Sequence, residues 1–236
     1  MSEPSHSRFV APVGAVVFAA LLCACAPAPT RPSHNRLART QVLALVQGLN
    51  ADLLGHDSAT LTLERWCAAH RLAEPARIVA QRVRGQDKPL PPELRERLAI
   101  VADEPVAYRR VHLACGAHVL SEADNWYVPS RLTPDMNHRL DNTDEPFGKV
   151  VRALDFRRRT IGAELLWSPL PADWEMSAQA DAESSAPLRI PHALLRHEAI
   201  LYTAAQQPFS AVVETYTNQV LDFGPWAAYL AVDADP

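Results

Sequence analysis

Val106–Val128 reads VAYRRVHLACGAHVLSEADNWYV, and this stretch has the clearest strand pattern of the chain. It contains two runs, Val106–Ala114 and His118–Val128, that are rich in the β-branched and aromatic residues typical of strands. The linker between them, Cys115-Gly116-Ala117, is short and contains glycine, as hairpin turns do. The stretch therefore predicts two antiparallel strands joined by a tight turn.

A second hairpin is predicted towards the C-terminus. Leu194–Thr203 and Phe209–Leu221 are β-like runs on either side of Ala204–Pro208. Ala76–Arg84 alternates well enough to be a further strand, and Arg157–Trp167 is expected to be another.

Helices are predicted mainly in the N-terminal part. Asn35–Leu54 carries apolar residues at spacings of three and four, which is one face of an amphipathic helix. Asp57 or Ser58 can cap a second helix that ends at His70. Short helices are also expected over two later ranges, Glu93–Ile100 and Asp135–Leu140. Helices followed by antiparallel strands predict an α+β fold with the helices packed on one face of the sheet.

Composition limits the function classes. The chain has 236 residues, of which 48% are hydrophobic and 21% charged, so it is long and apolar enough for one packed domain. The 23 basic and 27 acidic residues give a formal net charge of -4, which is not the charge pattern of a nucleic-acid-binding protein. We therefore expect no nucleic-acid partner.

Residues 1–24 are interpreted as a leader. An apolar run, Val13–Ala24, follows Arg8 and is too short to span a membrane, so it favours a secretory signal. Its end, Leu22-Cys23-Ala24-Cys25, looks like a bacterial lipoprotein signal with Cys25 as the lipidated residue. This interpretation predicts a membrane-anchored lipoprotein in the periplasm. Two alternatives are cleavage without lipidation and a misassigned start codon, which would leave the protein in the cytoplasm.

The rest of the chain is expected to form one domain. Residues 25–34 contain three prolines and predict an extended tether, after which residues 35–236 form the domain. Within it, residues 171–191 are rich in Pro, Ala, Ser and Asp and are interpreted as a mobile insertion. Cys67 and Cys115 match no zinc spacing, so we expect no metal site; they are buried small residues or, if the domain is exported, a disulfide.

Two strand charges are the candidates for chemistry, because nucleophile-elbow, phosphate-loop, dinucleotide and zinc-protease motifs are absent from the sequence. Arg110 shares a strand face with Tyr108 and His112, and Glu214 shares one with Tyr216. If those faces are interior, both charges need partners. The alternative is that the two charges pair with each other or face solvent.

The order and spacing of five segments resemble the chorismate pyruvate-lyase family, whose members release pyruvate from chorismate to give 4-hydroxybenzoate for ubiquinone. The resemblance covers residues 51–217. It rests on these segments: Asp57-Ser58-Ala59-Thr60, Tyr108–Leu113, Asn125–Pro129, Pro146–Lys149 and Pro208–Glu214.

The resemblance implies a chorismate lyase-like fold, no cofactor and a small aromatic or cyclohexadienyl carboxylate as ligand. Arg110 falls where the family's arginine binds the ring carboxylate, and Glu214 where its glutamate meets the oxygen at the far end of the ring. Both would be catalytic as well as substrate-binding. Phe147 takes the place of a leucine whose backbone contacts the ligand, and Asn125 stands in place of a second arginine.

Two functions remain open at this point. The first is a carbon–oxygen lyase acting on chorismate. The second is a non-catalytic lipoprotein that holds a small aromatic carboxylic acid in the same pocket. The leader separates them, because a protein exported from the cytosol would rarely meet chorismate.

Overall fold

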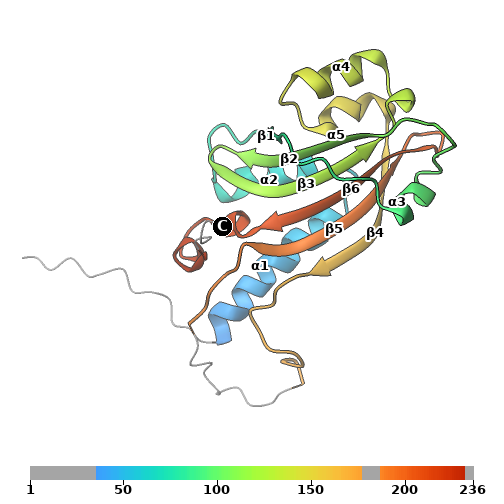
Figure 1. The fold of residues 1–236 in the computed structure, drawn as a ribbon. Coiled ribbons are helices and arrows are strands. Elements are labelled where there is room, and N and C mark those ends of the chain that lie inside the picture. The colour runs from blue at the N-terminus through green and yellow to red at the C-terminus, as the bar shows by residue number, and fades with distance from the viewer. Residues whose placement is uncertain (1–35, 177–186, 232–236) are drawn as a thin grey trace, which may run out of the picture. The chain divides into compact units, whose positions relative to one another are not determined.

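The computed structural model describes residues 36–176 and 187–231, and there the chain is of the α+β class. Six strands form one antiparallel sheet in the order β1-β2-β3-β6-β5-β4 (Figure 1). Both predicted hairpins are confirmed, as β2–β3 and β5–β6, and β3 pairs with β6 to join them. The strands are β1 (Ile78–Val83), β2 (Ala107–Cys115), β3 (His118–Tyr127), β4 (Arg157–Leu165), β5 (Ala193–Tyr202) and β6 (Pro208–Thr217).

Five α-helices lie in the same part of the chain: α1 (Arg36–Leu54), α2 (Ala59–His70), α3 (Pro92–Arg97), α4 (Pro134–Asn142) and α5 (Phe147–Val150). The predicted cap of α2 is confirmed, because the Ser58 side chain accepts the Leu61 N–H at 3.3 Å. The predicted strand to Leu221 is too long. Thr217 ends it by accepting the Gln219 N–H, and Asn218–Leu221 turn into a 3-10 helix.

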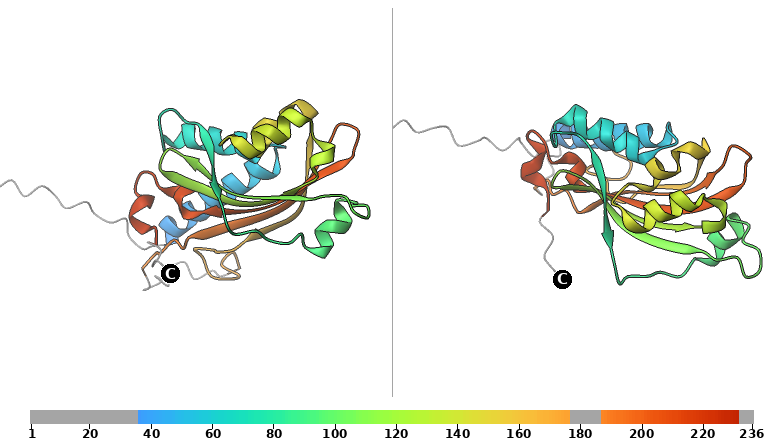
Figure 2. Two further views of the ribbon diagram at one scale, coloured as in Figure 1. Left: turned by 45° about the horizontal axis from the view of Figure 1, so that its top comes forward. Right: turned by 90° about the horizontal axis from the view of Figure 1, so that it is seen from above.

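The two long helices, α1 and α2, cover one face of the sheet (Figure 2). Val42 and Leu49 of α1 and Leu63 of α2 are fully buried against strand residues of this face. Cys67 of α2 and Cys115 of β2 form a disulfide, which settles the choice between free thiols and a bridge. The bridge fixes α2 to the sheet.

The short helix α3 lies on the opposite face, so the helices do not all pack on one side. Leu94 and Leu98 form a cluster with Trp126 of β3, Ile200 of β5 and Ala211 of β6. The central strands carry apolar side chains on both faces, and an apolar face must be covered. The segment that contains α3 provides that cover.

The two remaining helices, α4 and α5, pack around one end of the sheet. Met136 and Leu140 of α4 are buried in a cluster with Tyr127 of β3 and Phe209 of β6, and Phe147 of α5 packs against it. This cluster brings α5 beside the helix-covered face, where the candidate site lies.

The expected leader, residues 1–24, and tether, residues 25–34, lie outside the described residues. So do residues 177–186 of the expected insertion. Leu188 and Ile190, however, are buried in the core, and Ile190 pairs with Leu230 in a parallel bridge. The packed domain therefore resumes before residue 191.

Candidate functional site

Alternation along β2 separates its side chains into two environments. Arg109, Val111 and Leu113 are buried on the face covered by α1 and α2. Tyr108 and Arg110 lie on the other face. The same alternation applies to β3 and β6, so each pocket below belongs to one face.

A pocket with a cavity of about 50 Å³ lies between the helix-covered face and the segments over it. The sheet forms its floor, α2 and α5 contribute their first residues, and β4 contributes one end. Its lining residues are Asp57, Ser58, Ala59, Thr60, Arg109, Val111, Leu113, Ala123, Asn125, Phe147, Gly148, Phe156, Arg158, Leu201, Val212 and Glu214.

Arg109 is the first of two buried cations in this pocket. Its guanidinium donates to the carbonyls of Glu145 and Thr143 at 3.1–3.3 Å, while its Nε has no acceptor. Only 2% of the residue is exposed, and no carboxylate of the described residues forms an ion pair with it. Burial lowers the pKa of Arg109, because water no longer solvates the charge. A buried cation held only by carbonyls favours an anion beside it.

Asn125 of β3 lies directly opposite Arg109 in the strand register. Its Oδ1 accepts the Ser210 hydroxyl at 2.6 Å, but its Nδ2 is buried with no acceptor. Arg109 Nε and Asn125 Nδ2 are thus two unsatisfied N–H donors on paired positions that line one cavity. Unsatisfied buried donors are uncommon in folded proteins, and a bound acceptor is one explanation.

A second polar cluster lies at the β4 side of the pocket. Arg158 donates to Glu214 at 2.6 Å, and the Tyr216 hydroxyl donates to the same carboxylate oxygen at 3.0 Å. Burial, and then the Glu214 charge, raises the pKa of Tyr216 well above its ordinary value. Burial alone would lower the pKa of Arg158, but Glu214 reverses this effect and raises it. The cluster is therefore a buried, ordered ion pair at the edge of the cavity.

The N-terminus of α2 also faces this pocket, through Ser58, Ala59 and Thr60. The positive end of a helix dipole adds to the attraction for an anion. Asp57, just before the helix, accepts the Arg158 N–H at 2.8 Å and pairs with Arg157 at 3.2 Å, which ties α2 to β4.

Phe147, predicted to be a binding residue, lines the pocket from α5. Its ring lies 5.4 Å from Tyr127 and 6.3 Å from Phe209, measured between centroids. Glu214 also lines the pocket, so the structure brings these two predicted residues together.

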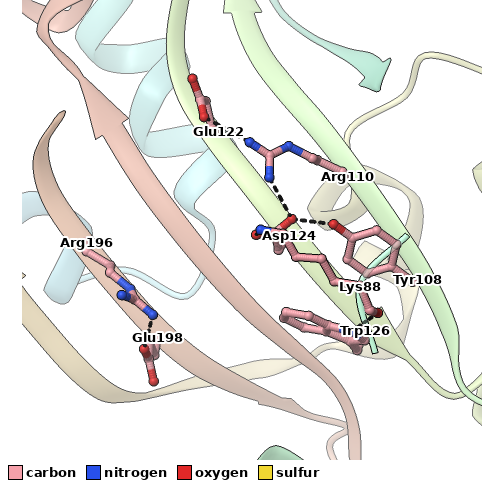
Figure 3. A network of polar contacts seen from close by, with 8 residues as sticks. All are labelled: Lys88, Tyr108, Arg110, Glu122, Asp124, Trp126, Arg196 and Glu198. Carbon is pink, nitrogen blue, oxygen red and sulfur yellow. Dashed lines mark hydrogen bonds and ion pairs between the residues drawn. The ribbon is translucent and has the colours of Figure 1, made fainter. Parts of the chain in front are cut away.

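Arg110 lies elsewhere. It points away from the pocket and pairs with Glu122 at 3.2 Å and Asp124 at 3.5 Å on the outer face of β3 (Figure 3). Glu214 pairs with Arg158 instead. The two predicted catalytic residues thus neither share a site nor pair with each other, because the period of two puts them on opposite faces.

The sequence contained a signal for the arginine that does face the pocket. Arg109 shares its strand parity with Val111, Leu113 and Cys115, and the apolar set of a strand marks the buried face. Asn125 follows from the same rule. Arg158 could not be found in this way, because β4 is an edge strand without a clear alternation.

A metal-binding cluster and a membrane-spanning helix are both absent from residues 36–176 and 187–231. No group of three histidine, cysteine or acidic side chains is arranged to hold a metal ion. No helix has the length and apolar character to cross a lipid bilayer.

Comparison with curated proteins places the chain in a family. It is 56% identical over 188 residues to the uncharacterized protein y4mC of Sinorhizobium fredii, an alignment that covers 79% of each chain. The chain therefore belongs to the same family as y4mC. No family model matches the sequence.

Solved structures show partial likeness at low identity. PhnF from Mycobacterium smegmatis aligns at 14% identity and a TM-score of 0.45, covering 77% of this chain and 71% of that one. The effector domain of the same protein aligns at 14% and 0.41, with coverages of 63% and 87%. The possible transcriptional regulator YydK from Bacillus subtilis aligns at 16% and 0.37, covering 62% of this chain and 61% of YydK. Likenesses of this size do not define a shared function.

One buried titratable side chain, that of His197, lies opposite Glu214 in the strand register. His197 of β5 is fully buried; its Nε2 is 2.8 Å from Asn50 Oδ1, and its Nδ1 has no partner. Its ring packs edge-on against Tyr216 with centroids 5.3 Å apart. Burial lowers the pKa of His197 below its ordinary value of 6.5, and the Arg158 charge lowers it further.

We expect this histidine to make stability fall with acid. A folded-state pKa below the unfolded value means that the unfolded chain binds the proton first, so stability is present above pH 6.5 and is lost as the pH falls. Between pH 7 and pH 5 the wild type should lose up to about 2 kcal/mol more unfolding free energy than His197→Gln, measured by urea denaturation. Exposed His138→Gln serves as the control and should follow the wild type; identical pH profiles for all three proteins would contradict the assignment.

Proposed function

We propose that the domain binds a small aromatic or cyclohexadienyl carboxylate in the pocket over β2, β3 and β6. The observation that carries this proposal is the pair of buried donors without an acceptor, Arg109 Nε and Asn125 Nδ2. Because both line one cavity from paired positions, a single ligand carboxylate would satisfy both. Arg109 then has the role that the family resemblance assigned to Arg110.

The remaining lining suits a ring with a polar group at its far end. Val111, Val212 and Phe156 contribute apolar surface, and Glu214 offers an acceptor for a ligand hydroxyl. The cavity of about 50 Å³ is smaller than the ~150 Å³ that holds benzene in a protein core. A ring therefore fits only if side chains of the lining move.

A lyase that eliminates pyruvate from chorismate is the second candidate. Enclosure of the Glu214 carboxylate at the pocket edge favours it. In this reaction the C–O bond between the ring and the enolpyruvyl group breaks with its electron pair going to the oxygen, and the adjacent ring carbon loses a proton, so that the ring becomes aromatic. The enolpyruvate that leaves takes up one proton and becomes pyruvate. The Glu214 carboxylate would accept the proton from the ring carbon or stabilise the charge that develops there, and Arg158 would hold the Glu214 carboxylate in position.

We also propose that the protein is a lipoprotein of the periplasm and that a lipid on Cys25 anchors it to the membrane. It is supported by the signal-like end Leu22-Cys23-Ala24-Cys25 and by the Cys67–Cys115 disulfide, since disulfides persist mainly in oxidising compartments. A periplasmic location favours binding over the lyase reaction, because chorismate is a cytosolic metabolite.

Arg109→Lys should weaken binding of 4-hydroxybenzoate by about ten-fold, because a single ammonium group replaces the planar guanidinium and its Nε donor is lost. Titration calorimetry measures this change. The matched control is Arg110→Lys, the adjacent arginine on the opposite face, which should bind as the wild type does. If Arg110→Lys weakens binding and Arg109→Lys does not, the ligand carboxylate is bound by Arg110 instead.

Glu214→Gln separates the lyase from the binder. In the lyase it should reduce pyruvate release from chorismate by roughly 10²–10⁴-fold, the range for a positioned acid–base group, while 4-hydroxybenzoate still binds. Glu198→Gln, on the neighbouring strand but the other face, should keep the wild-type rate. If the wild type releases no pyruvate at all, the lyase candidate is excluded.

Cys25→Ser should move the protein from the membrane fraction to the soluble fraction, because the residue that carries the lipid is lost. Fractionation of the source bacterium followed by immunoblotting measures this. A wild-type protein that is already fully soluble would contradict the anchor.

A further inference from the structure

A second pocket lies on the outer face of the sheet, opposite the proposed ligand site. Its cavity is about 330 Å³, within the range of small-molecule sites in proteins. It is bounded by β3, β6 and β5 and by the segment that leads into α3. Its lining residues are Lys88, Pro89, Pro91, Glu93, Leu94, Asp124, Trp126, Arg196, Glu198 and Val213.

The strand register explains why this face is hollowed. Asp124 of β3 and Glu198 of β5 are both paired with Val213 of β6. Strands β3 and β5 flank β6, so their lining side chains, which include the long Trp126, Arg196 and Glu198, stand on either side of the short Val213. Adjacent strands are about 4.8 Å apart, so the backbones of the two walls are separated by about 9.6 Å. The result is a groove with one charged wall on each side (Figure 3).

The wall at β3 is rich in donors. Asp124 accepts from Lys88 at 2.6 Å, from the Tyr108 hydroxyl at 2.5 Å and from Arg110 at 3.5 Å. One carboxylate thus serves two cations and a hydroxyl. Lys88 has three N–H donors, and its side chain is 46% exposed, so it retains donors for a ligand.

Lys88 is held at both ends. Its ammonium pairs with Asp124, and its backbone carbonyl accepts the Trp126 indole N–H at 3.0 Å. The Trp126 ring in turn lies 5.4 Å from the Tyr108 ring, between centroids. The cation is therefore positioned before any ligand arrives, which reduces the ordering cost of binding.

The wall at β5 has acceptors to spare. Glu198 pairs with Arg196 through one carboxylate oxygen at 2.9 Å, and its other oxygen makes no bond among the described residues. Glu93, at the start of α3, lines the same groove and is exposed, with no ion pair in the described chain. The lining as a whole has two cations and three carboxylates, so the groove can accept a positive group, and Glu198 and Glu93 are the carboxylates that retain free acceptors among the described residues.

We propose that this groove binds a small zwitterion of about dipeptide length, with its carboxylate at Lys88 and its ammonium at Glu198 and Glu93. An extended residue spans about 3.3–3.6 Å, so two residues cover about 7 Å of the roughly 9.6 Å between the two walls, whereas one residue covers only about a third of it. A free amino acid is too short to meet both ends. This site is separate from the proposed carboxylate pocket, which lies on the other face.

The test uses the full-length chain, titration calorimetry and glycylglycine as the probe. Glycylglycine should bind, whereas glycine, N-acetylglycine and glycinamide, each of which lacks the length or one charge, should bind about ten-fold more weakly. Equal binding of all four compounds, or no binding of glycylglycine, would overturn the proposal.

Matched variants locate the site. Lys88→Met and Glu93→Gln should each weaken glycylglycine binding by about ten-fold. Arg95→Met and Glu96→Gln remove the same charges from exposed positions of α3 that do not line the groove, and both should bind as the wild type does. All four side chains are exposed, so folding should survive in every variant. Equal loss in Arg95→Met would show a general charge effect and no site at the groove.

Discussion

Consecutive side chains of a strand point to opposite faces of a sheet, and this constraint assigns every polar group of β2 and β3 to one of two environments. Arg109 and Asn125 face the helices, where both side chains are buried. Arg110 and Asp124, one residue away in each strand, join a network of half-exposed charges on the other face. The two pockets described above, one on each face, follow from this single division.

The helix-covered face holds two arginines in different states. Arg158 has a carboxylate partner, Glu214, so its charge is compensated within the protein. In the part of the chain that the structure describes, Arg109 has only carbonyl oxygens as partners, and its Nε has no acceptor. A buried ion pair is complete without a ligand, whereas a buried cation without an anion is stabilised by binding one. This difference points to Arg109 as the centre of ligand binding.

The outer face differs from the helix-covered face in how its charged side chains are paired. Lys88 pairs with Asp124 on one wall and Arg196 pairs with Glu198 on the other, and the short Val213 leaves the space between the walls open. A face of this kind selects a ligand by the spacing of its charges, since its net charge is small. The Cys67–Cys115 bridge and the cap at Ser58 act on the other side, where they hold α2 over the first pocket.

Most of the fold could be predicted from local pattern. The hairpin of Val106–Val128, the amphipathic helix that ends at Leu54 and the cap at Ser58 all depend on residues close together in the chain, and all three are confirmed. The position of α3 on the second face could not be predicted, because it depends on which surface the sheet leaves uncovered.

The site divides in the same way. The family resemblance in the sequence predicted that Glu214 and Phe147 belong to one site, and both line the same pocket; strand parity already separated Arg109 from Arg110. Only the tertiary structure shows that Arg158 neutralises Glu214 and that no carboxylate of the described residues pairs with Arg109. Pairing between charges 56 residues apart depends on strand order and register, which no local pattern contains.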